Sequence, residues 1–385
     1  MKAHLPRVRI SPALYATLER HARGSLAACR SVADDGTVLY FPDGSGNYPA
    51  LWTRDFCYMV EGTGHLMPAD EILGCIDYLL AGQREDGTIP DRVYADGHAV
   101  YCAGPESKPL GLKPPTDNAQ FLGKLLCAYV RLSGDHQALA ARMGKVMAAM
   151  ESVPLSRESL VFIDRNSPHS GYGFTDCIAK TGKEFFSSML YWEACQRLGA
   201  TCADYEYHED AHYWYERAEA AGGYMSQFVD DKCGLFVAAT EDCKQIDIWG
   251  NGYAAVIRLA SKTQARRIAE FFVEVYDELV YHGFVRHLPA GEYWERLLGD
   301  IKPDTYQNGG YWALPAGWVA QTIALIDEAA ARRLLADVAA EFDEHGVSEW
   351  ISSSDRRLEY YAASAAAVLG SVQSAKALAD EKSDE

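Results

Sequence analysis

Basic residues are scarce in this 385-residue sequence, which has 36 Lys and Arg against 54 Asp and Glu and a formal net charge of −18 at pH 7. This imbalance argues against nucleic acid and anionic membranes as partners, because both attract basic surfaces. The sequence also lacks an apolar run of about 18 residues, which a membrane-spanning helix needs, and an apolar leader near its start. We therefore expect a cytoplasmic protein without a membrane partner.

Paired cysteines and nucleotide-binding glycine motifs are missing as well. The ten cysteines are dispersed without a CxxC pair, and Cys57, Cys75 and Cys127 fall on apolar helix faces, so we interpret them as buried, reduced thiols. No GxxxxGK[ST] loop, strand-linked GxGxxG or GxSxG elbow occurs. His208 and His212 lie four residues apart, a spacing we interpret as a surface pair. The sequence therefore predicts neither a cofactor nor a metal site.

Hydrophobic residues recur at helical spacing along most of the chain. Phe121, Leu122, Leu125 and Leu126 share one face, and Ser11 followed by a proline marks a helix start. The pattern predicts about twelve helices, over residues 11–30, 50–62, 68–82, 117–133, 135–151, 182–199, 203–228, 249–260, 262–280, 312–326, 327–344 and 359–370.

The connections between these helices alternate between long and short. Short links such as Ser133-Gly134 make antiparallel helix pairs. In a ring of such pairs, all long connections emerge at one end. We therefore predict an all-α (α/α)6 toroid with short β-hairpins in the long loops, at 235–239 and 281–288. We expect a single domain over 1–375 and a flexible tail over 376–385.

The first candidate group for chemistry is Trp52, Arg54 and Asp55, at the start of a predicted helix. An Arg-Asp pair can donate to and accept from two neighbouring hydroxyls, and a Trp face offers an apolar platform for a sugar ring. A salt bridge that only caps the helix is the alternative interpretation.

Carboxylates in two long loops are candidates for acid–base catalysis. Asp176 follows a segment rich in Gly and aromatic residues, where apolar surroundings would raise its pKa as a general acid requires. Nearby Lys180 and Lys183 would lower that pKa if they were close. Glu349 lies in the last long loop, which the ring would bring over the same centre, and Glu359 competes with it. Each acid alone could instead be a helix cap or a solvated side chain.

Amide, hydroxyl and aromatic side chains that suit sugar hydroxyls recur in the other long loops. Any one of them could serve as a cap or turn, but together on one face they favour a carbohydrate site. The candidate substrate-binding residues are Trp52, Arg54, Asp55, Asp117, Asn118, Tyr172, Lys180, Trp249, Tyr306, Gln307, Asn308, Trp312 and Trp350.

Several segments resemble six-hairpin glycosidases, namely YPALWTRDF, PTDNAQFLGKL, GYGFTDCIAKTGKEFFSSMLYWEA, QIDIWGNGYA, YQNGGYWALPAGW and SEW. Over nearly its whole length the chain is similar to the inverting exo-glucosidase clan of processing α-glucosidases and glucosylglycerate or mannosylglycerate hydrolases. This resemblance implies that Asp176 is the general acid and Glu349 the general base. The sequence around the base departs from the family pattern, which leaves Glu359 open.

We therefore expect an exo-acting glycoside hydrolase that releases a terminal hexose, α-linked glucose or a similar sugar, with inversion. A sugar 2-epimerase or an unsaturated glycuronyl hydrolase uses the same toroid, and a non-catalytic sugar-binding toroid is a third alternative. Linkage, aglycone and oligomeric state stay open at this point.

Overall fold

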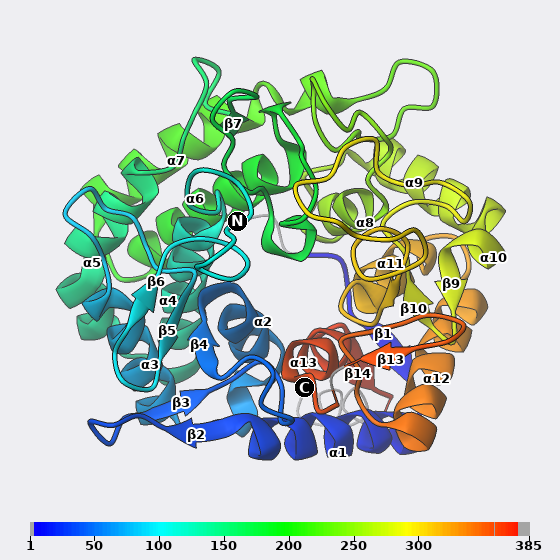
Figure 1. The fold of residues 1–385 in the computed structure, drawn as a ribbon, viewed down its shortest axis with the longest axis horizontal. Coiled ribbons are helices and arrows are strands. Elements are labelled where there is room, and N and C mark those ends of the chain that lie inside the picture. The colour runs from blue at the N-terminus through cyan, green and yellow to red at the C-terminus, as the bar shows by residue number, and fades with distance from the viewer. Residues whose placement is uncertain (1–3, 358, 376–385) are drawn as a thin grey trace, which may run out of the picture.

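The computed structural model, which describes residues 4–357 and 359–375, forms a ring of two helical layers (Figure 1). The inner helices are α2 (Thr53–Thr63), α4 (Asn118–Ser133), α6 (Phe185–Asp204), α8 (Ile248–Val256), α11 (Ala316–Ile323) and α13 (Ala362–Gly370). The outer helices are α1 (Pro12–Cys29), α3 (Ala69–Ala81), α5 (His136–Glu151), α7 (His208–Gly222), α9 (Lys262–Glu274), α10 (Tyr276–Leu279) and α12 (Glu328–His345). Neighbouring inner helices pack on one another, and α13 packs against α2 to close the ring. The predicted toroid is confirmed.

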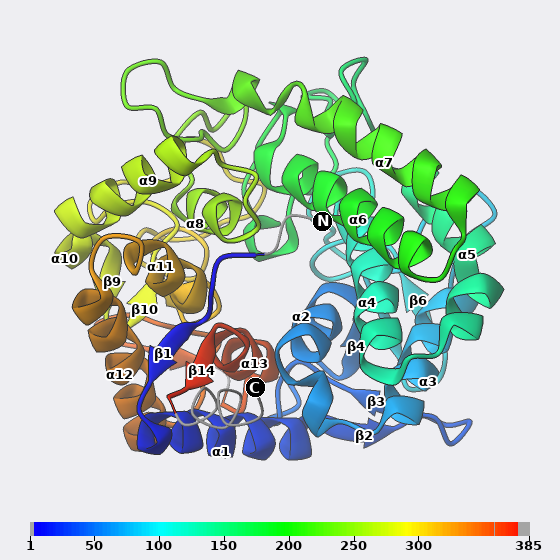
Figure 2. The ribbon, with the colours of Figure 1, turned by 180° about the vertical axis from the view of Figure 1, so that it is seen from behind.

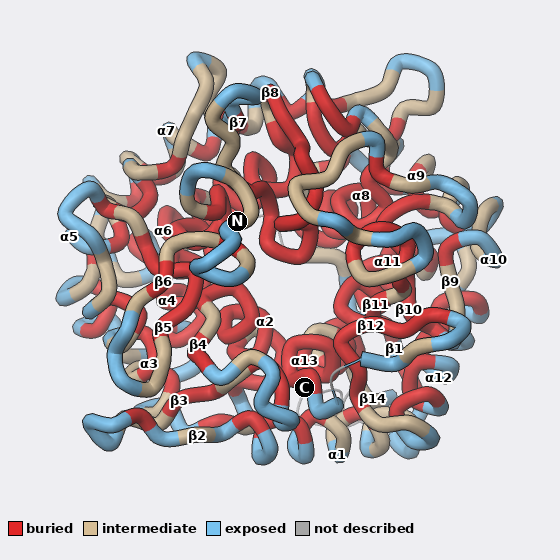
Figure 3. Tube along the Cα trace, in the orientation of Figure 1, coloured by how far each residue is buried: buried red, intermediate tan, exposed pale blue. Residues whose placement is uncertain are grey.

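Burial explains which helices take which layer. Every residue of α8 and α11 is buried, whereas the buried residues of α7 are Ala211, Trp214, Ala218 and Ala221, at helical spacing. A helix that is apolar all round belongs inside, and one with a single apolar stripe belongs outside. Figure 3 shows this difference as an inner ring of buried segments.

Two predicted helices end differently in the structure. The segment 262–280 is interrupted at Val275, whose φ of −108° and ψ of 24° leave the helical region, so that α9 and α10 are separate. The predicted helix over 203–228 is shorter in the structure and corresponds to α7. Its first two residues belong to the end of α6. Its last residues, Met225–Phe228, form a separate 3-10 turn after Gly222 and Gly223. The predicted start at Ser11 is confirmed, since its side chain accepts a hydrogen bond from the Leu14 N–H.

The strands are short and stabilise the connections. β1 (Val8–Ile10) runs parallel to β14 (Val372–Ser374) and so joins the two ends of the ring. Three small antiparallel groups follow, made of β2 (Arg30–Val32) with β3 (Val38–Tyr40), of β4 (Ala50–Trp52) with β5 (Arg92–Tyr94) and β6 (Ala99–Val100), and of β7 (Phe162–Ile163) with β8 (Gly182–Lys183). The largest sheet has the order β13 (Arg356–Arg357), β12 (Trp350–Ile351), β11 (Tyr311–Trp312), β10 (Phe284–Val285) and β9 (Val280–Tyr281).

The two hairpin predictions have different outcomes. Segment 281–288 contains the turn between β9 and β10, as expected. Segment 235–239 forms only isolated bridges, because Phe236, Val237 and Ala239 each pair with a different part of the chain. The prediction at 235–239 is therefore met only by isolated antiparallel bridges, without a regular strand.

All six connections that lead from an outer to an inner helix are long, and they emerge at one end of the ring. The links from an inner helix to the next outer one are short and lie at the opposite end, which faces the viewer in Figure 2. The ten cysteines are free, and eight of them are buried. No helix in the described part of the chain has the length and apolar character needed to span a bilayer. The predicted tail 376–385 lies outside the described residues.

Candidate active site

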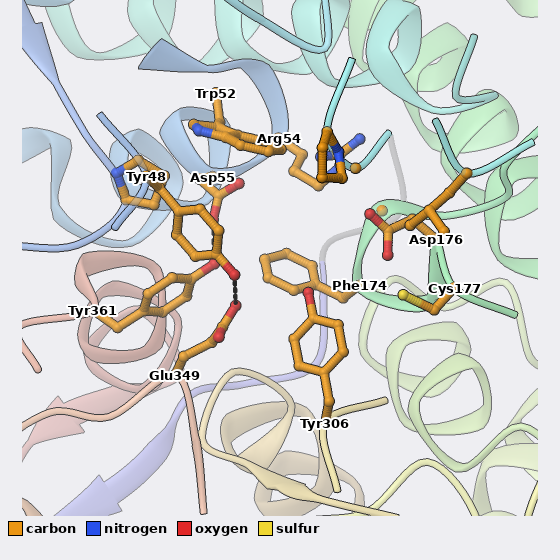
Figure 4. A pocket seen from close by; sticks show the side chains of 15 residues that line it. Tyr48, Trp52, Arg54, Asp55, Phe174, Asp176, Cys177, Tyr306, Glu349 and Tyr361 are labelled. Atoms are coloured by element: carbon orange, nitrogen blue, oxygen red, sulfur yellow. Dashed lines mark hydrogen bonds between the residues drawn. The ribbon is translucent and has the colours of Figure 1, made fainter. Parts of the chain in front are cut away.

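The long loops and the first turn of α2 surround a cavity of about 290 Å³ (Figure 4). Six of the predicted site residues line it: Trp52, Arg54, Asp55, Asp176, Tyr306 and Glu349. The other lining residues are Pro42, Tyr48, Gly104, Pro105, Leu110, Gly173, Phe174, Cys177 and Tyr361. The cavity therefore combines carboxyl groups with aromatic rings.

Trp52 forms part of one wall, where β4 runs into α2. Tyr48 meets its ring edge-on at 5.4 Å between centroids, and the Arg92 guanidinium lies 4.7 Å from its ring centroid. These two neighbours fix the indole in place. Its buried Nε1–H has no hydrogen-bond partner within the described residues.

Arg54 is held in an ion-pair cluster at the base of the cavity. Its Nη2 lies 2.5 Å from Asp91 Oδ1, and its Nε lies 3.3 Å from Asp117 Oδ2. The second arginine, Arg92, lies 3.1 Å from Asp91 Oδ2. Two arginines are thus balanced by two aspartates, both fully buried. Asp117 and Asn118, predicted to bind substrate, lie behind Arg54 and do not line the cavity.

Three carboxyl groups face the cavity from different elements, and each accepts a hydrogen bond. Asp55 accepts from the Tyr361 hydroxyl at 2.5 Å, and Glu349 accepts from the Tyr48 hydroxyl at 3.2 Å. Figure 4 shows Asp176 on the opposite wall from Glu349 and Asp55.

Burial changes the protonation of these carboxyl groups. It raises the pKa of Asp55 and that of Asp176 to about 6, against the opposing charge of Arg54. Burial also raises the pKa of Glu349 well above its ordinary value, and the charge of Asp55 adds to this rise. The charge of Asp176 raises the pKa of Glu349 as well, so the titration of Glu349 depends on both neighbouring carboxyl groups.

The two lysines near Asp176 are engaged elsewhere. Lys180 Nζ lies 2.7 Å from Glu184 Oε1, and both side chains are fully buried. Lys183 contacts Gln227 and Glu158. Lys180 therefore does not line the cavity, and neither lysine is among the main causes of the shift in the Asp176 pKa.

Gln307 touches Asp176 rather than the cavity. Its Nε2 donates to Asp176 Oδ1 at 2.8 Å, and its Oε1 accepts from the Cys177 N–H at 2.9 Å. One amide thus fixes both the side chain and the backbone at this acid. Asn308 accepts from the Trp294 N–H, and Trp312 Nε1 donates to the Tyr306 carbonyl, so both hold their own loop together.

The remaining predicted residues lie outside the cavity. Tyr172 is bonded to the Tyr58 hydroxyl in the core, and Trp249 is buried with its ring stacked 3.6 Å from that of His287. Trp350 is buried beside Tyr306. Glu359 is exposed at the surface, so of the two C-terminal glutamates only Glu349 lines the cavity.

Sequence reasoning missed Tyr48, Phe174 and Tyr361 as lining residues. For Tyr48 a signal exists in the turn-forming sequence DGSGN before it. Asp43 accepts hydrogen bonds from the backbone N–H groups of Ser45, Asn47 and Tyr48. Such an Asx turn fixes the path of the loop.

The described residues include no group of three or more His, Cys, Asp or Glu side chains placed to hold a metal. Residues 208–212 do read HEDAH, which matches the H-E-x-x-H pattern of zinc peptidases. His212 nevertheless points outward from α7, with its side chain 75% exposed and 3.1 Å from Glu216.

Comparison with known proteins supports the fold. No family model matches the chain, and no curated protein sequence matches it significantly. A mannosylglycerate hydrolase of family GH63 from Thermus thermophilus, solved with glucose, superposes with a TM-score of 0.67 at 15% identity, over 92% of this chain and 99% of that one.

Two further solved structures extend the likeness. The glucoamylase from Saccharomycopsis fibuligera has a TM-score of 0.62 at 12% identity, over 96% and 97% of the two chains. A rhamnosidase from Klebsiella oxytoca with rhamnose bound has a TM-score of 0.65 at 14% identity, over 96% of this chain and 65% of that one. The protein thus has the (α/α)6-barrel fold of the six-hairpin glycosidases.

Proposed function

We propose that the protein is a glycoside hydrolase that removes a terminal hexose with inversion at the anomeric carbon. The observation that carries this proposal is the pair Asp176 and Glu349, which face each other across one cavity. Inverting glycosidases need two carboxyl groups on opposite sides of the scissile bond, with room for one water molecule between base and sugar.

In the proposed reaction, Asp176 gives its proton to the glycosidic oxygen as the bond from that oxygen to the anomeric carbon breaks. Glu349 takes a proton from water, whose oxygen bonds to the same carbon from the opposite face. The products are a hexose of inverted configuration and the free alcohol. Asp176 is then ionised and Glu349 protonated, and proton exchange with solvent restores both.

The surroundings of Asp176 suit the role of general acid, and Glu349 is held by a hydrogen bond from Tyr48. Asp176 has a pKa raised to about 6 by burial, which keeps a proton on it in mildly acidic solution. Gln307 holds its carboxyl group in one orientation. The Tyr48 hydroxyl donates to Glu349, and this hydrogen bond opposes part of the rise in the Glu349 pKa that burial causes.

The closed base of the cavity supports an exo mode of action. Arg54, Asp55, Phe174 and Tyr361 lie there and are each at most 4% exposed. A pocket with a buried floor of this kind favours the end of a sugar chain. The Asp55 carboxylate can accept from sugar hydroxyls, and the Trp52 ring offers the sugar an apolar platform.

The alternative activities on this fold lack matching groups. A 2-epimerase needs an acid and a base beside a carbonyl carbon, often histidines, but no histidine is among the described residues lining the cavity. A glycuronyl hydrolase needs cations for its substrate carboxylate, and Arg54 is already ion-paired.

Hydrolysis of α-glucosides and α-mannosides by the purified protein tests the proposal. We expect Asp176→Asn and Glu349→Gln each to lower kcat by about 10²–10⁴-fold while sugar binding persists, and Glu359→Gln to have no such effect. Sugar binding without turnover by the unmodified protein would instead identify a binding toroid. Full activity of Asp176→Asn would refute the assigned acid.

A further inference from the structure

The cavity has no cation that is available for an anionic leaving group. Among the described residues that line it, Arg54 is the one basic side chain. Asp91 and Asp117 already engage its guanidinium, and Arg92 behind the wall shares Asp91. This cluster of two arginines and two aspartates is neutral overall.

The three carboxyl groups on the cavity wall are therefore unbalanced. The charge of Asp55 raises the pKa of Glu349, and the charge of Asp176 does the same. Ionisation of Glu349 is thus opposed by each of the other two when they are charged. A carboxylate on the substrate would add a further negative charge to a site of low dielectric, where like charges are costly.

The mouth of the cavity is apolar. Pro105 is exposed there, and Leu110 is half-buried beside it. Both belong to one loop, which is closed by a hydrogen bond from the Leu110 N–H to the Ala103 carbonyl at 2.9 Å. Lys108, on the same loop, is exposed and does not line the cavity. An alkyl group that leaves water against these side chains gains free energy in proportion to the area buried.

We propose that the leaving group is an uncharged alcohol with an apolar part, and that glycosides of hydroxy acids are poor substrates. This inference rests on the proposed glycosidase function and names the class of its substrate. It separates the chain from the glucosylglycerate and mannosylglycerate hydrolases, which are one part of the clan that its sequence resembles. Carboxylates are rejected by repulsion from Asp55 and Glu349, and apolar alcohols are retained by the mouth residues.

Matched substrates test the charge part of the proposal. The α-glucosides and α-mannosides of glycerol and of D-glycerate differ only by a CH₂OH group in place of a carboxylate. We expect kcat/KM for the glycerate glycoside to be at least about tenfold lower, since a like-charge contact costs several kcal/mol and each 1.4 kcal/mol is tenfold. The gap should narrow as ionic strength rises, because salt screens charge repulsion.

A cation placed at the mouth should reverse the discrimination. Leu110→Arg, and independently Pro105→Arg, should raise kcat/KM for the glycerate glycoside about tenfold relative to the glycerol glycoside. Leu112→Arg is the matched control, because Leu112 is 75% exposed and does not line the cavity. A gain in Leu112→Arg equal to that in Leu110→Arg and Pro105→Arg would contradict the local mechanism.

Hexyl and methyl glycosides of the same sugar test the apolar part. We expect a several-fold higher kcat/KM for the hexyl glycoside, and equal values would overturn this part. If glycerate glycosides are hydrolysed as well as glycerol glycosides, the inference fails while the proposed hydrolase function stands. If no glycoside in the panel is hydrolysed, the proposed function itself fails.

Discussion

At the scale of single residues, the cavity holds carboxyl groups that folding makes costly to ionise. Asp176 is 7% exposed, and burial is the largest cause of its raised pKa. A raised pKa means that the folded protein binds this proton more tightly than the unfolded chain does. The contribution of the group to stability is therefore complete below about pH 4 and is lost as the pH rises through about 6.

Replacing Asp176 should therefore stabilise the protein at neutral pH while it removes activity. We expect Asp176→Asn to gain up to about 3 kcal/mol in unfolding free energy at pH 8 relative to pH 4, since the pKa rise spans about two units. Denaturant unfolding of both proteins at the two pH values measures this. If the unfolding free energies of Asp176→Asn and the unmodified protein differed by the same amount at pH 4 and at pH 8, burial would not be the cause of the raised Asp176 pKa.

The raised pKa of Asp176 also determines how turnover depends on pH. Because Asp176 must carry its proton to act as acid, kcat/KM should fall as the pH rises above about 6. This fall is measured as the alkaline limb of the profile of kcat/KM against pH, with a substrate whose leaving group is uncharged. In Glu349→Gln the limb should remain near the same pH, because Glu349 is not among the main causes of the raised Asp176 pKa. An activity that increases steadily to pH 9 would argue against an acid of this kind.

At the scale of structural elements, loop 43–48 sets the position of the proposed base. Asp43 is 2% exposed and anchors the loop, and the loop presents Tyr48 to Glu349. Pattern and spacing cannot give such a contact, because Tyr48 and Glu349 are 301 residues apart.

Breaking this anchor should affect both stability and catalysis. Asp43→Ala removes the acceptor of the backbone N–H groups of Ser45, Asn47 and Tyr48, at about 0.5–1.5 kcal/mol for each hydrogen bond, and should lower kcat about tenfold or more. Tyr48→Phe removes only the hydroxyl, and we expect it to lower kcat with little change in the melting temperature. Kinetics and thermal unfolding of the pair separate the two effects. Unchanged kcat in both variants would show that the loop does not position Glu349.

Helical periodicity predicted the elements well, and it failed where local geometry decides. It could not show the break at Val275 or the bridges of segment 235–239, which depend on contacts with other parts of the chain. Reasoning from residue type correctly predicted that Trp52 and Asp176 belong to the site, but it also predicted Lys180, which does not line the cavity. It cannot by itself distinguish a lysine that faces a ligand from one buried against Glu184.

At the scale of the whole molecule, closure of the ring depends on the close approach of the first and last inner helices. A Cβ atom added to Gly62 in α2 would lie 2.0 Å from the Ala366 carbonyl oxygen in α13. The alternation of long and short connections predicted the ring itself. It could not predict this contact, because glycine at a helix crossing leaves no periodic signal.

Substitution of this glycine tests the closure. We expect Gly62→Ala to lower the unfolding free energy by about 1–3 kcal/mol or more, because the backbone must move apart. The control is Gly144→Ala in α5, where an added Cβ meets nothing within 4 Å. That change should stabilise by about 0.5–1 kcal/mol. If Gly62→Ala stabilised the protein as Gly144→Ala does, α2 and α13 would not pack as closely as described.

The configuration of the released sugar tests the central claim most directly. Hydrolysis of an α-glucoside, followed by proton NMR from the first minutes, shows the anomer before mutarotation mixes the two forms. Two carboxyl groups acting from opposite walls predict β-glucose as the first product. α-Glucose as the first product would contradict the assignment of Asp176 and Glu349 as an inverting acid and base.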